Sequence, residues 1–561
     1  MADTTAEGAP ADKHPLTSMR TVIVASSAGT AFEWYDFFVF ASLAEPISKT
    51  FFSGLNDTAA YIAALALFGT GFLFRPVGAL IFGRIGDKMG RKGAFLATVL
   101  MMGGATFAIA LIPSYAQAQQ WFGAGIVAPL LLVLMRILQG IALGGEYGGA
   151  AIYVAEHSAS HKRGWSTSWV QTSAAFGLFG ALGVIYVTTK LLGVDAFGAW
   201  GWRIPFAFSI FLLGISVFMR LKLSESPEFA KLKAEGGQSK APYAEAFGKW
   251  SNLKLVLLAF FALMSAQGAV WYTAFFYVQT FLLKFLKVDQ LTINGLMMAA
   301  TAVSAVGYVV FGWLSDRVGR KWVMLAGMTL ALVFFFPGFH LLERYANPAL
   351  AEATERTPVT VTADPADCAL QFDPVGKAAF LSSCDIAKST LANAGISYTN
   401  KAGPKGAPAV VEIGSTQVAV AAAKGLDKAA TKAAKAKGEG AVKAALKAAG
   451  YPAKADPARI NFWGMLGVLV VFVIAATALF GPLAASLVEL FPTRVRYTAL
   501  SLPYHIGTGW VGGFVPFTAF AIVAATGNIY AGLWYPFAFT LISVVTTLFL
   551  YPETNGKRLD A

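Results

Sequence analysis

The sequence predicts an all-α integral membrane protein with twelve transmembrane helices in two six-helix halves. Of its 561 residues, 56% are hydrophobic and only 13% are charged, and the mean hydropathy is +0.59. Apolar runs of roughly 18 or more residues recur along the chain, and each is long enough to cross ~30 Å of hydrocarbon as a helix. A ten-residue motif that occurs twice indicates that the unit is duplicated.

The duplicated motif is GRIGDKMGRK at Gly83–Lys92, which returns as GWLSDRVGRK at Gly312–Lys321. Each copy lies between two long apolar runs, and we expect it to form a short, basic, glycine-marked turn. The copies match at Gly83/Gly312, Asp87/Asp316, Gly90/Gly319, Arg91/Arg320 and Lys92/Lys321. We call the two copies the signatures.

Six spans are expected in each half. Those of the first half (20–223) are about 20–43, 59–82, 94–113, 124–150, 166–192 and 203–222. Those of the second half are about 254–280, 290–311 and 322–342, then 460–482, 497–525 and 531–551. The polar segment 224–253 joins the halves, and tails 1–19 and 552–561 flank them. The first apolar run is too long and too acidic for a cleaved signal, so we expect it to remain as an anchor.

A second repeated pair locates one insertion. Glu156 is followed seven residues later by Arg163, and Glu489 seven residues later by Arg496, both after the fourth span of their half. The distance from signature to glutamate is 104 residues longer in the second half. An insertion of about 343–459, between the ninth and tenth spans, explains this excess.

The distribution of charge in the loops predicts the orientation. Lys and Arg gather at the signatures, in the middle segment and at the chain end, whereas the short loops on the other side hold few of them. Basic loops stay in the cytoplasm, so both termini are expected there and the insertion outside. The same rule explains the net charge of +13 without a nucleic-acid partner.

The insertion holds both cysteines, Cys368 and Cys384. A pair in an outer, oxidising compartment favours a disulfide over two free thiols. The segment Ala421–Ala449 is rich in Ala and Lys, and is expected to be partly helical. Its charge suits anionic solutes or lipid headgroups, but a solvated, weakly ordered arm is the simpler expectation.

The signature pattern, with duplication and twelve spans, resembles the major facilitator superfamily over the whole chain except the insertion. Finer features resemble its metabolite:proton symporters, which carry proline/betaine, 2-oxoglutarate, citrate or shikimate. These are FEWYDFF (32–38), FRPVGALIFG (74–83), RILQGIALGGEYGGA (136–150), WRIPF (202–206), ESPEF (225–229) and ELFPTRVRYTALSLPYHIG (489–507). The resemblance implies a secondary transporter, monomeric and without a cofactor.

Ionic side chains inside spans are the candidates for proton coupling, because a charge in mid-bilayer costs about 2.5–3.5 kcal/mol and usually faces a cavity. Glu33 and Asp36 lie in the first span, and Arg136 lies at about mid-depth in the fourth. We expect Asp36, with Glu33 as second choice, to bind the proton, and pairing with Arg136 to switch its protonation. A static buried ion pair is the alternative.

For the solute, we expect contacts from two cations and several polar side chains. Arg75 is the best cation for a carboxylate, because Arg binds one bidentately; a latch to the signature loop is its alternative. His505 is either a proton relay or a structural histidine, and the tyrosines either line a cavity or pack. The full set is Arg75, Arg136, Gln139, Gln171, Tyr272, Tyr277 and His505.

The signatures resemble the family's latch, which holds the inward side shut. Asp87 and Asp316 are expected to pair with Arg91, Arg320 or helix-end dipoles, with Gly83, Gly90, Gly312 and Gly319 in the same layer. The pairs Glu156–Arg163 and Glu489–Arg496 add to it. Glu146 lies off the Arg136 face and is expected to be a further gate contact.

The polar segments contain no metal-ligand spacing, phosphate-binding glycine loop or catalytic triad, so we expect no enzyme. The favoured function is proton-coupled uptake of a small carboxylate or zwitterion across a cell (inner) membrane. Two alternatives stay open. One is a proton antiporter that exports drugs or metabolites, and the other is a sensor that reuses the transporter fold.

Overall fold

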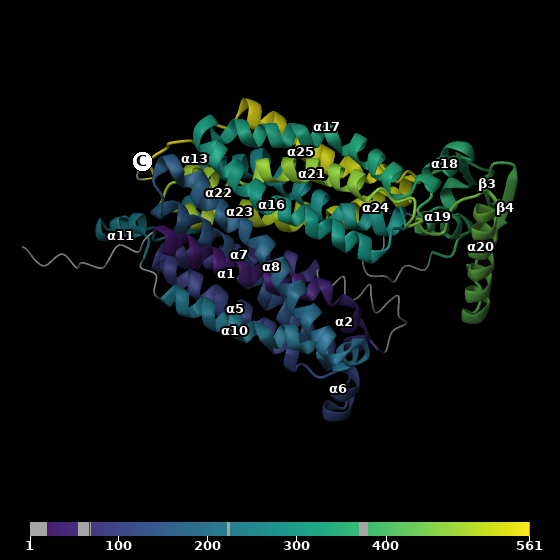
Figure 1. Cartoon of the computed structure of the whole chain (residues 1–561), viewed down its shortest axis with the longest axis horizontal. Coiled ribbons are helices and arrows are strands. Elements are labelled where there is room, and N and C mark those ends of the chain that lie inside the picture. Colours follow the sequence, from purple (N-terminus) through teal and green to yellow (C-terminus); the bar gives the residue numbers. More distant parts are fainter. Residues whose placement is uncertain (1–18, 54–66, 68, 222–224, 370–379, 560–561) are drawn as a thin grey trace, which may run out of the picture.

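The computed structural model describes residues 19–53, 67, 69–221, 225–369 and 380–559. Figure 1 shows two groups of long helices side by side, the N-terminal half in purple to blue and the C-terminal half in teal to yellow. The long helices of the N-terminal half are α1 (Met19–Ser42), α4 (Arg75–Met89), α5 (Arg91–Leu111), α7 (Val127–His157), α8 (Arg163–Leu192) and α10 (Arg203–Leu221). Its short helices are α2 (Ala44–Phe51), α6 (Tyr115–Phe122), η1 (Ser160–Lys162), α9 (Val194–Ala196) and η2 (Phe197–Gly201).

The C-terminal half follows a linker that holds α11 (Pro227–Ala234) and α12 (Pro242–Phe247). Its first long helix, Trp250–Phe285, alternates between α and π geometry: α13 (Trp250–Ala259), η3 (Phe260–Met264), α14 (Ser265–Tyr272), η4 (Thr273–Tyr277), α15 (Val278–Thr280) and η5 (Phe281–Phe285). The others are α16 (Gln290–Val318), α17 (Arg320–Ala346), α21 (Phe462–Phe480) with α22 (Leu483–Leu490), α23 (Arg496–His505) with η7 (Ile506–Gly512) and α24 (Val515–Thr526), and η8 (Ala531–Leu533) with α25 (Trp534–Phe549).

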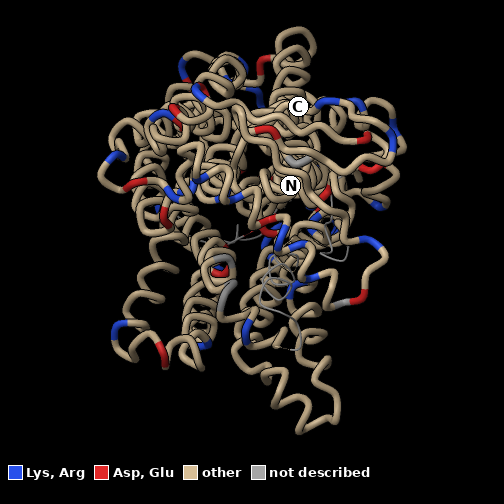
Figure 2. Tube along the Cα trace, turned by 90° about the vertical axis from the view of Figure 1, so that its right-hand side faces the viewer, with Lys and Arg blue, Asp and Glu red and all other residues tan. Residues whose placement is uncertain are grey.

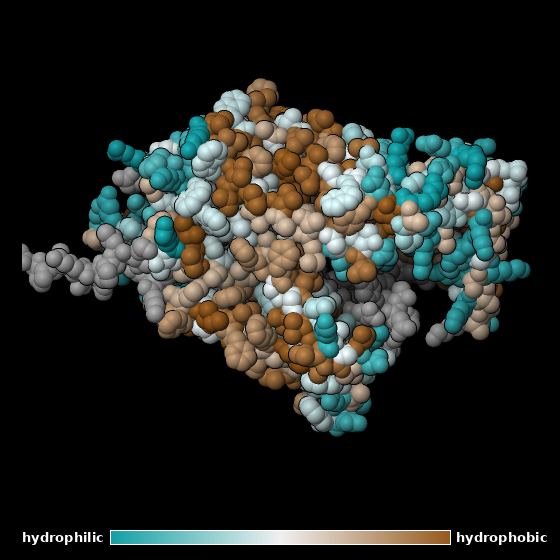
Figure 3. Space-filling view, viewed as in Figure 1, coloured by the Kyte–Doolittle hydropathy of each residue, from teal (hydrophilic) through white to brown (hydrophobic). Residues whose placement is uncertain are grey.

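Ten helices of the described residues are long and apolar enough to cross a membrane. Of the other two expected spans, the first is α1, with 24 residues. The second, 59–82, begins outside the described residues and continues in α4. The predicted helical fold with two halves is therefore confirmed for the bundle, whereas the insertion adds a small sheet that was not predicted. A brown apolar surface covers the middle of the bundle, and hydrophilic residues gather at its two ends (Figure 3).

The signatures differ from the predicted turns. Seven of the ten residues of each copy continue a helix, because α4 ends at Met89 and α16 ends at Val318. Only Gly90 and Gly319 break it, with φ of 121° and 108°. L side chains rarely adopt these angles, and a Cβ on either residue would also collide with the carboxylate of Glu225 or Glu553. Each turn thus consists of a single glycine.

The insertion is a small folded domain at the opposite end of the bundle from the signatures (Figure 1). It consists of α18 (Pro348–Arg356), β1 (Val359–Ala363), η6 (Pro365–Asp367), α19 (Ser383–Ala394), β2 (Tyr398–Ala402), β3 (Ala409–Ile413), β4 (Thr416–Val420) and α20 (Lys428–Ala448). The strand order is β2-β1-β3-β4; β1 and β2 are parallel and the other neighbours antiparallel. Cys368 and Cys384 are joined in a disulfide, with their Cα atoms 5.2 Å apart.

The expectation of a weakly ordered arm at 421–449 is wrong. Asp427 caps α20 by accepting from the amides of Ala429 (2.9 Å) and Ala430 (2.8 Å). Val442 and Leu446 are buried in the core of the domain, so one face of the helix is held by packing. Seen from this end of the molecule, basic residues are spread over the insertion (Figure 2).

Candidate functional site

A small cavity lies between the two halves at the centre of the bundle. From the N-terminal half, α1, α4 and α7 provide Thr30, Glu33, Trp34, Phe37, Arg75, Leu143 and Tyr147. From the C-terminal half, α14, α21, α23 and η7 provide Gln267, Trp271, Tyr272, Phe480, Tyr504, His505 and Thr508. Its volume of about 20 Å³ admits water and is smaller than a metabolite, so the site is closed in this conformation. We call it the central cavity.

Arg75 is the main cation of the central cavity. Its side chain is buried, and its guanidinium lies over Phe72, 4.5 Å from the ring centre. Tyr272 lies beside it. Among the residues that the structure describes, its Nε has no hydrogen-bond partner and it forms no ion pair with a carboxylate. The guanidinium is thus placed to bind an anionic group in the cavity.

Glu33 and two tryptophans form another part of the wall. Oε2 of Glu33 has no hydrogen-bond partner among the described residues. Trp34 and Trp271 come from opposite halves, and their ring centres are 5.7 Å apart. A carboxylate beside aromatic faces is a favourable environment for a cation. The cavity therefore has a guanidinium in one part of its wall and a carboxylate with aromatic rings in another.

His505 and Gln171 reach the central cavity in different ways. His505 lines it; its ring nitrogens make no hydrogen bond of normal geometry within the described chain, although the Gly144 backbone lies beside the ring. Gln171 donates to the Tyr147 hydroxyl (2.6 Å). Tyr147 in turn stacks on Tyr504, with ring centres 3.7 Å apart. Gln171 thus orients a cavity wall.

Tyr277 does not reach the cavity that Tyr272 lines. It is fully buried inside the C-terminal half and stacks on Phe339, with ring centres 5.5 Å apart. The expectation that it contacts the solute is therefore not supported by the geometry. Tyr277 lies five residues after Tyr272, which is about 140° around a regular α-helix, so one helix face does not present both side chains.

Asp36 and Arg136 are connected by a chain of hydrogen bonds and not by direct contact. Arg136 donates to Oε1 of Gln139 (2.9 Å), and Gln139 donates to Oγ1 of Thr106 (2.7 Å). Oγ1 of Thr106 lies 2.9 Å from Oδ2 of Asp36 and also 2.9 Å from the Met102 carbonyl, so its single hydrogen serves one of them at a time. The predicted direct pair is replaced by a relay, in which Gln139 and Arg136 lie away from the central cavity.

Glu146 is not a contact between the halves. It forms a buried ion pair with Arg220 of α10, in its own half. It also accepts a hydrogen bond from Thr98 (2.6 Å). The prediction of a gate contact is therefore wrong, because the side chain points into the N-terminal half.

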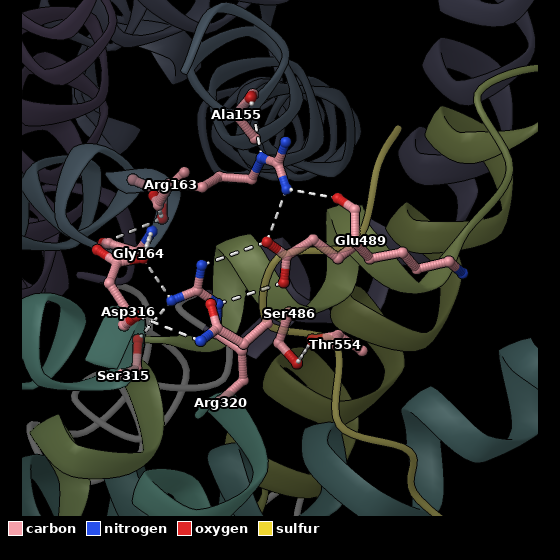
Figure 4. Close-up of polar contacts among 12 residues, drawn as sticks. Ala155, Arg163, Gly164, Ser315, Asp316, Arg320, Ser486, Glu489 and Thr554 are labelled. Carbon is pink, nitrogen blue, oxygen red and sulfur yellow. Dashed lines mark hydrogen bonds and ion pairs between the residues drawn. The ribbon is translucent and has the colours of Figure 1, made fainter. Parts of the chain in front are cut away.

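At the signature end, buried ion pairs join the two halves. Arg163 of the N-terminal half bonds Glu489 of the C-terminal half (2.7 Å), which Arg320 also contacts (3.2 Å; Figure 4). In the symmetry-related pair, Arg496 of the C-terminal half bonds Glu156 of the N-terminal half (2.7 Å). Each glutamate thus pairs with the arginine of the opposite half and not with the one seven residues ahead. We call these contacts the gate layer.

The signature aspartates cap helices of the opposite half. Asp87 accepts from the amides of Tyr497 (3.2 Å) and Thr498 (2.9 Å), at the start of α23. Asp316 accepts from the amides of Gly164 (2.9 Å) and Trp165 (2.8 Å), at the start of α8. A carboxylate is favoured at a helix N-terminus, where free amides and the helix dipole meet it. Asp87 and Asp316 also pair with Arg91 (2.7 Å) and Arg320 (2.6 Å), respectively.

Two signature glycines permit this close approach. A Cβ on Gly83 would collide with the backbone of Thr498 in α23, and one on Gly312 with Ser168 in α8. Two further carboxylates, which were not predicted from the sequence, complete the layer. Glu225 accepts from the Arg91 amide (3.1 Å), and Glu553 from the Arg320 amide (2.9 Å).

An exposed pair ties the linker to the gate layer. Arg494 donates two hydrogen bonds to Glu245 of α12, at 2.6 and 3.0 Å. These bonds hold the pKa of the Glu245 carboxyl below its usual range. Because both groups reach solvent, the pair stabilises the layer less than the buried pairs do.

Comparisons with known proteins agree with this architecture. A family model described as "Sugar (and other) transporter" matches residues 21–253 and 445–561. The "Inner membrane metabolite transport protein YhjE" of Escherichia coli K12 is 35% identical over 348 residues, which cover 60% of this chain and 76% of that protein. The "Shikimate transporter" of the same organism is 34% identical, over 58% of this chain and 74% of its own. The "Proline/betaine transporter" of Salmonella typhimurium LT2 is 36% identical, over 58% and 65%.

Among solved structures, the proton:xylose symporter XylE of the major facilitator superfamily, bound to 6-bromo-6-deoxy-D-glucose, superposes with a TM-score of 0.61. The superposition covers 97% of this chain and 98% of that one, at 14% identity, so the likeness concerns the fold. The predicted fold is confirmed. The chain is a multi-pass membrane transporter, not an enzyme, and belongs to the sugar (and other) transporter family.

Proposed function

We propose that this chain imports a small carboxylate or zwitterionic metabolite together with protons, by alternating access. The central cavity carries this proposal, because it presents Arg75 without a carboxylate partner among the described residues and Glu33 beside Trp34 and Trp271. Arg75 suits the carboxylate of the solute. The second wall suits an ammonium group, so a zwitterion meets both.

The names of the relatives support the same class of solute. Among them are transporters of shikimate, of α-ketoglutarate, of proline and betaine, and of glycine betaine, proline, ectoine and pipecolic acid. Each of these solutes carries a carboxylate. Proline, the betaines, ectoine and pipecolic acid also carry a positive nitrogen. The two walls of the cavity fit this combination of a carboxylate and a positive nitrogen.

Proton coupling is assigned to Asp36 and Glu33. Both are held inside the first span, where a permanent charge is costly. Asp36 connects through Thr106 and Gln139 to Arg136. Protonation of Asp36 removes the acceptor charge at one end of this chain. That change alters how tightly α1, α5 and α7 are held together, and so favours one conformation over another.

The gate layer supplies the conformational part. In our assignment, the basic signature end faces the cytoplasm, so the buried cross-half pairs hold the inward side shut. The solute reaches the central cavity from the other side. Release requires the pairs Arg163–Glu489 and Arg496–Glu156 to separate as the halves rock apart.

Uptake into proteoliposomes tests the function. Purified protein is given radiolabelled shikimate, 2-oxoglutarate, proline and glycine betaine, with and without an acidic exterior. We expect uphill accumulation of at least one of them when the exterior is acid, and its loss with a protonophore. Solute that leaves as protons enter favours the antiporter. Binding without flux under every gradient favours the sensor.

Arg75 variants test the assignment of the cavity. Arg75→Gln removes the cation, whereas Arg75→Lys keeps the charge without the bidentate geometry. We expect KM to rise strongly in the first variant and less in the second, with both proteins folded. An unchanged KM in Arg75→Gln contradicts a carboxylate site at this residue.

A further inference from the structure

A second cavity lies entirely within the N-terminal half and is lined by three carboxylates. α1 provides Glu33 and Asp36, α7 provides Glu146, and α10 provides Ser216. Glu33 also lines the central cavity. We call this second space the carboxylate cavity. Of the described residues that line it, only Glu33 also lines the central cavity.

Buried polar atoms without partners surround the carboxylate cavity. They are Oδ1 of Asp36, Oε2 of Glu33, Oγ of Ser216 and, on the neighbouring guanidinium, Nε of Arg220. Asp36, Ser216 and Arg220 are at most 4% exposed. Buried polar groups in proteins are almost always hydrogen-bonded, to protein or to ordered water. The rest of the lining is largely apolar and includes Val99, Met102 and Leu213, so these four atoms are the groups that water in the cavity would satisfy.

The volume of the carboxylate cavity is also sufficient for bound water. Its volume is about 20 Å³, and a water molecule needs about 10–15 Å³ on the same measure, with two to four polar partners. One water fits. Gly29 makes the arrangement possible, because a Cβ at this position would collide with the guanidinium of Arg220.

The polar groups form a column through the half. Arg136 and Glu146 are ten residues apart in α7, which corresponds to a rise of about 15 Å. Hydrogen bonds connect Arg136 through Gln139 and Thr106 to Asp36, and Asp36 and Glu146 both line the carboxylate cavity. The column thus continues from the relay to the ion pair of Glu146 with Arg220 without entering the route between the halves.

We propose that water in the carboxylate cavity passes protons between Asp36 and Glu146, so that protons cross through the N-terminal half while the solute crosses between the halves. This rests on the proposed symport and adds a separate path for the proton. Protonated Asp36 gives its proton to a water, and that water gives one of its protons to the Glu146 carboxylate. Asp36 is then ionised and Glu146 neutral, with the total charge unchanged.

Arg220 is the positioning residue of this step. While Glu146 is ionised, Arg220 pairs with it. Once Glu146 is neutral, Arg220 needs another counter-charge, and Glu33 lies within its electrostatic range. The other groups that face this region are Arg75 of α4, Tyr497 of α23 and the hydroxyls of Thr98 and Thr106 of α5. Arg220 thus links the proton path to Glu33, the residue shared with the solute site.

Matched substitutions at Ser216 test the path. Ser216→Leu fills the carboxylate cavity, and Ser216→Ala removes the hydroxyl but leaves the space. In proteoliposomes we measure uphill uptake driven by an acid exterior and, separately, exchange of labelled for unlabelled solute, which needs no net proton release. We expect Ser216→Leu to lose uphill accumulation while it keeps exchange, and Ser216→Ala to keep both.

A second variant tests the path independently if Ser216→Leu does not fold. Glu146→Gln/Arg220→Gln removes both charges together, so no buried charge is left unpaired, and it is expected to lose uphill accumulation with exchange retained. Wild-type accumulation in either Ser216→Leu or this double variant overturns the proton path. A wild-type protein without any proton-driven uptake overturns the proposed function itself, so the two failures are distinguishable. A high-resolution structure with no water between Asp36 and Glu146 also overturns the path.

Discussion

The contribution of the gate layer to the closed conformation can be measured by substitution of Glu489. Glu489→Gln keeps the shape of the side chain and removes its charge. Glu489 has two arginine partners, but only Arg163, at 2.7 Å, belongs to the opposite half. That contact is lost when the halves separate at the signature end, so it favours the closed gate. A hydrogen bond to a charged group contributes about 1.5–3 kcal/mol, and each 1.4 kcal/mol is tenfold. The equilibrium should therefore shift about 10- to 100-fold toward the open gate.

Distances between spin labels at the signature end measure this shift. Met89 and Val318 hold equivalent places in the two signatures and are exposed, so cysteines there carry the labels. The two native cysteines form a disulfide and do not compete for label. We expect a new population at longer distance in Glu489→Gln. Glu245→Gln is the control, because its pair with Arg494 is partly exposed and contributes at most about 1 kcal/mol.

Two results would refute this reasoning. One is an unchanged distance distribution in both Glu489→Gln and the symmetry-related Glu156→Gln. The other is a large loss of solute affinity with the distances unchanged, which would place Glu489 in the binding site. Exchange of the partners, Glu156→Arg with Arg496→Glu, should restore the closed population if the charge pair itself holds the gate.

Other predictions concern single features. Asp36→Asn should abolish accumulation driven by an acid exterior but keep solute exchange; retained accumulation would exclude Asp36 as the proton site. Arg75→Gln should raise KM about 10- to 100-fold, by the loss of a charge-assisted hydrogen bond of about 1.5–3 kcal/mol, as initial uptake rates can show. Gly90→Ala should lower the melting temperature, because a residue with Cβ is strained at φ 121°. Replacement of both Cys368 and Cys384 by Ser should destabilise the insertion by about 3 kcal/mol with unchanged uptake; lower uptake at equal protein level would show that the insertion takes part in transport.

The fold and the position of the gate could be predicted because their signals are periodic or repeated. Long apolar runs define the spans, and the two signatures define the halves. The ion-pair partners within the gate layer could not be predicted, because each glutamate precedes an arginine by seven residues, and this spacing suggests pairing inside one loop. In the structure Arg163 begins α8 at the interface between the halves, where Glu489 of the other half is the nearer partner. Pairing between segments more than 300 residues apart leaves no trace in the local sequence.

Inside the N-terminal half, the depth of the buried ionic residues in the membrane could be predicted, but their hydrogen-bond and ion-pair partners could not. The rise per residue places Glu33, Asp36 and Arg136 near one region, and the structure connects Asp36 to Arg136, yet through Thr106 and Gln139. Glu146 was assigned to the wrong surface, since its angle on a helical wheel does not name the neighbouring helix. Arg220, which the sequence did not single out, is the partner of Glu146.

Two errors come from local geometry. Tyr277 lies five residues after Tyr272, about 140° away on a regular helix, and in the structure it packs on Phe339 inside the C-terminal half. The small sheet of the insertion was missed, although VTVTA at Val359–Ala363 alternates between buried and half-buried residues along the strand. Strand-like alternation of this kind in a long loop was a usable signal.

Proton movement on addition of solute, in proteoliposomes without any imposed gradient, tests the coupling most directly. A pH-sensitive dye in the lumen reports protons that enter with the solute. Symport predicts that the lumen becomes more acid when the transported metabolite is added outside, and that Asp36→Asn shows no such change while it still exchanges solute. Solute uptake by the wild-type protein with a constant luminal pH would contradict proton-coupled import.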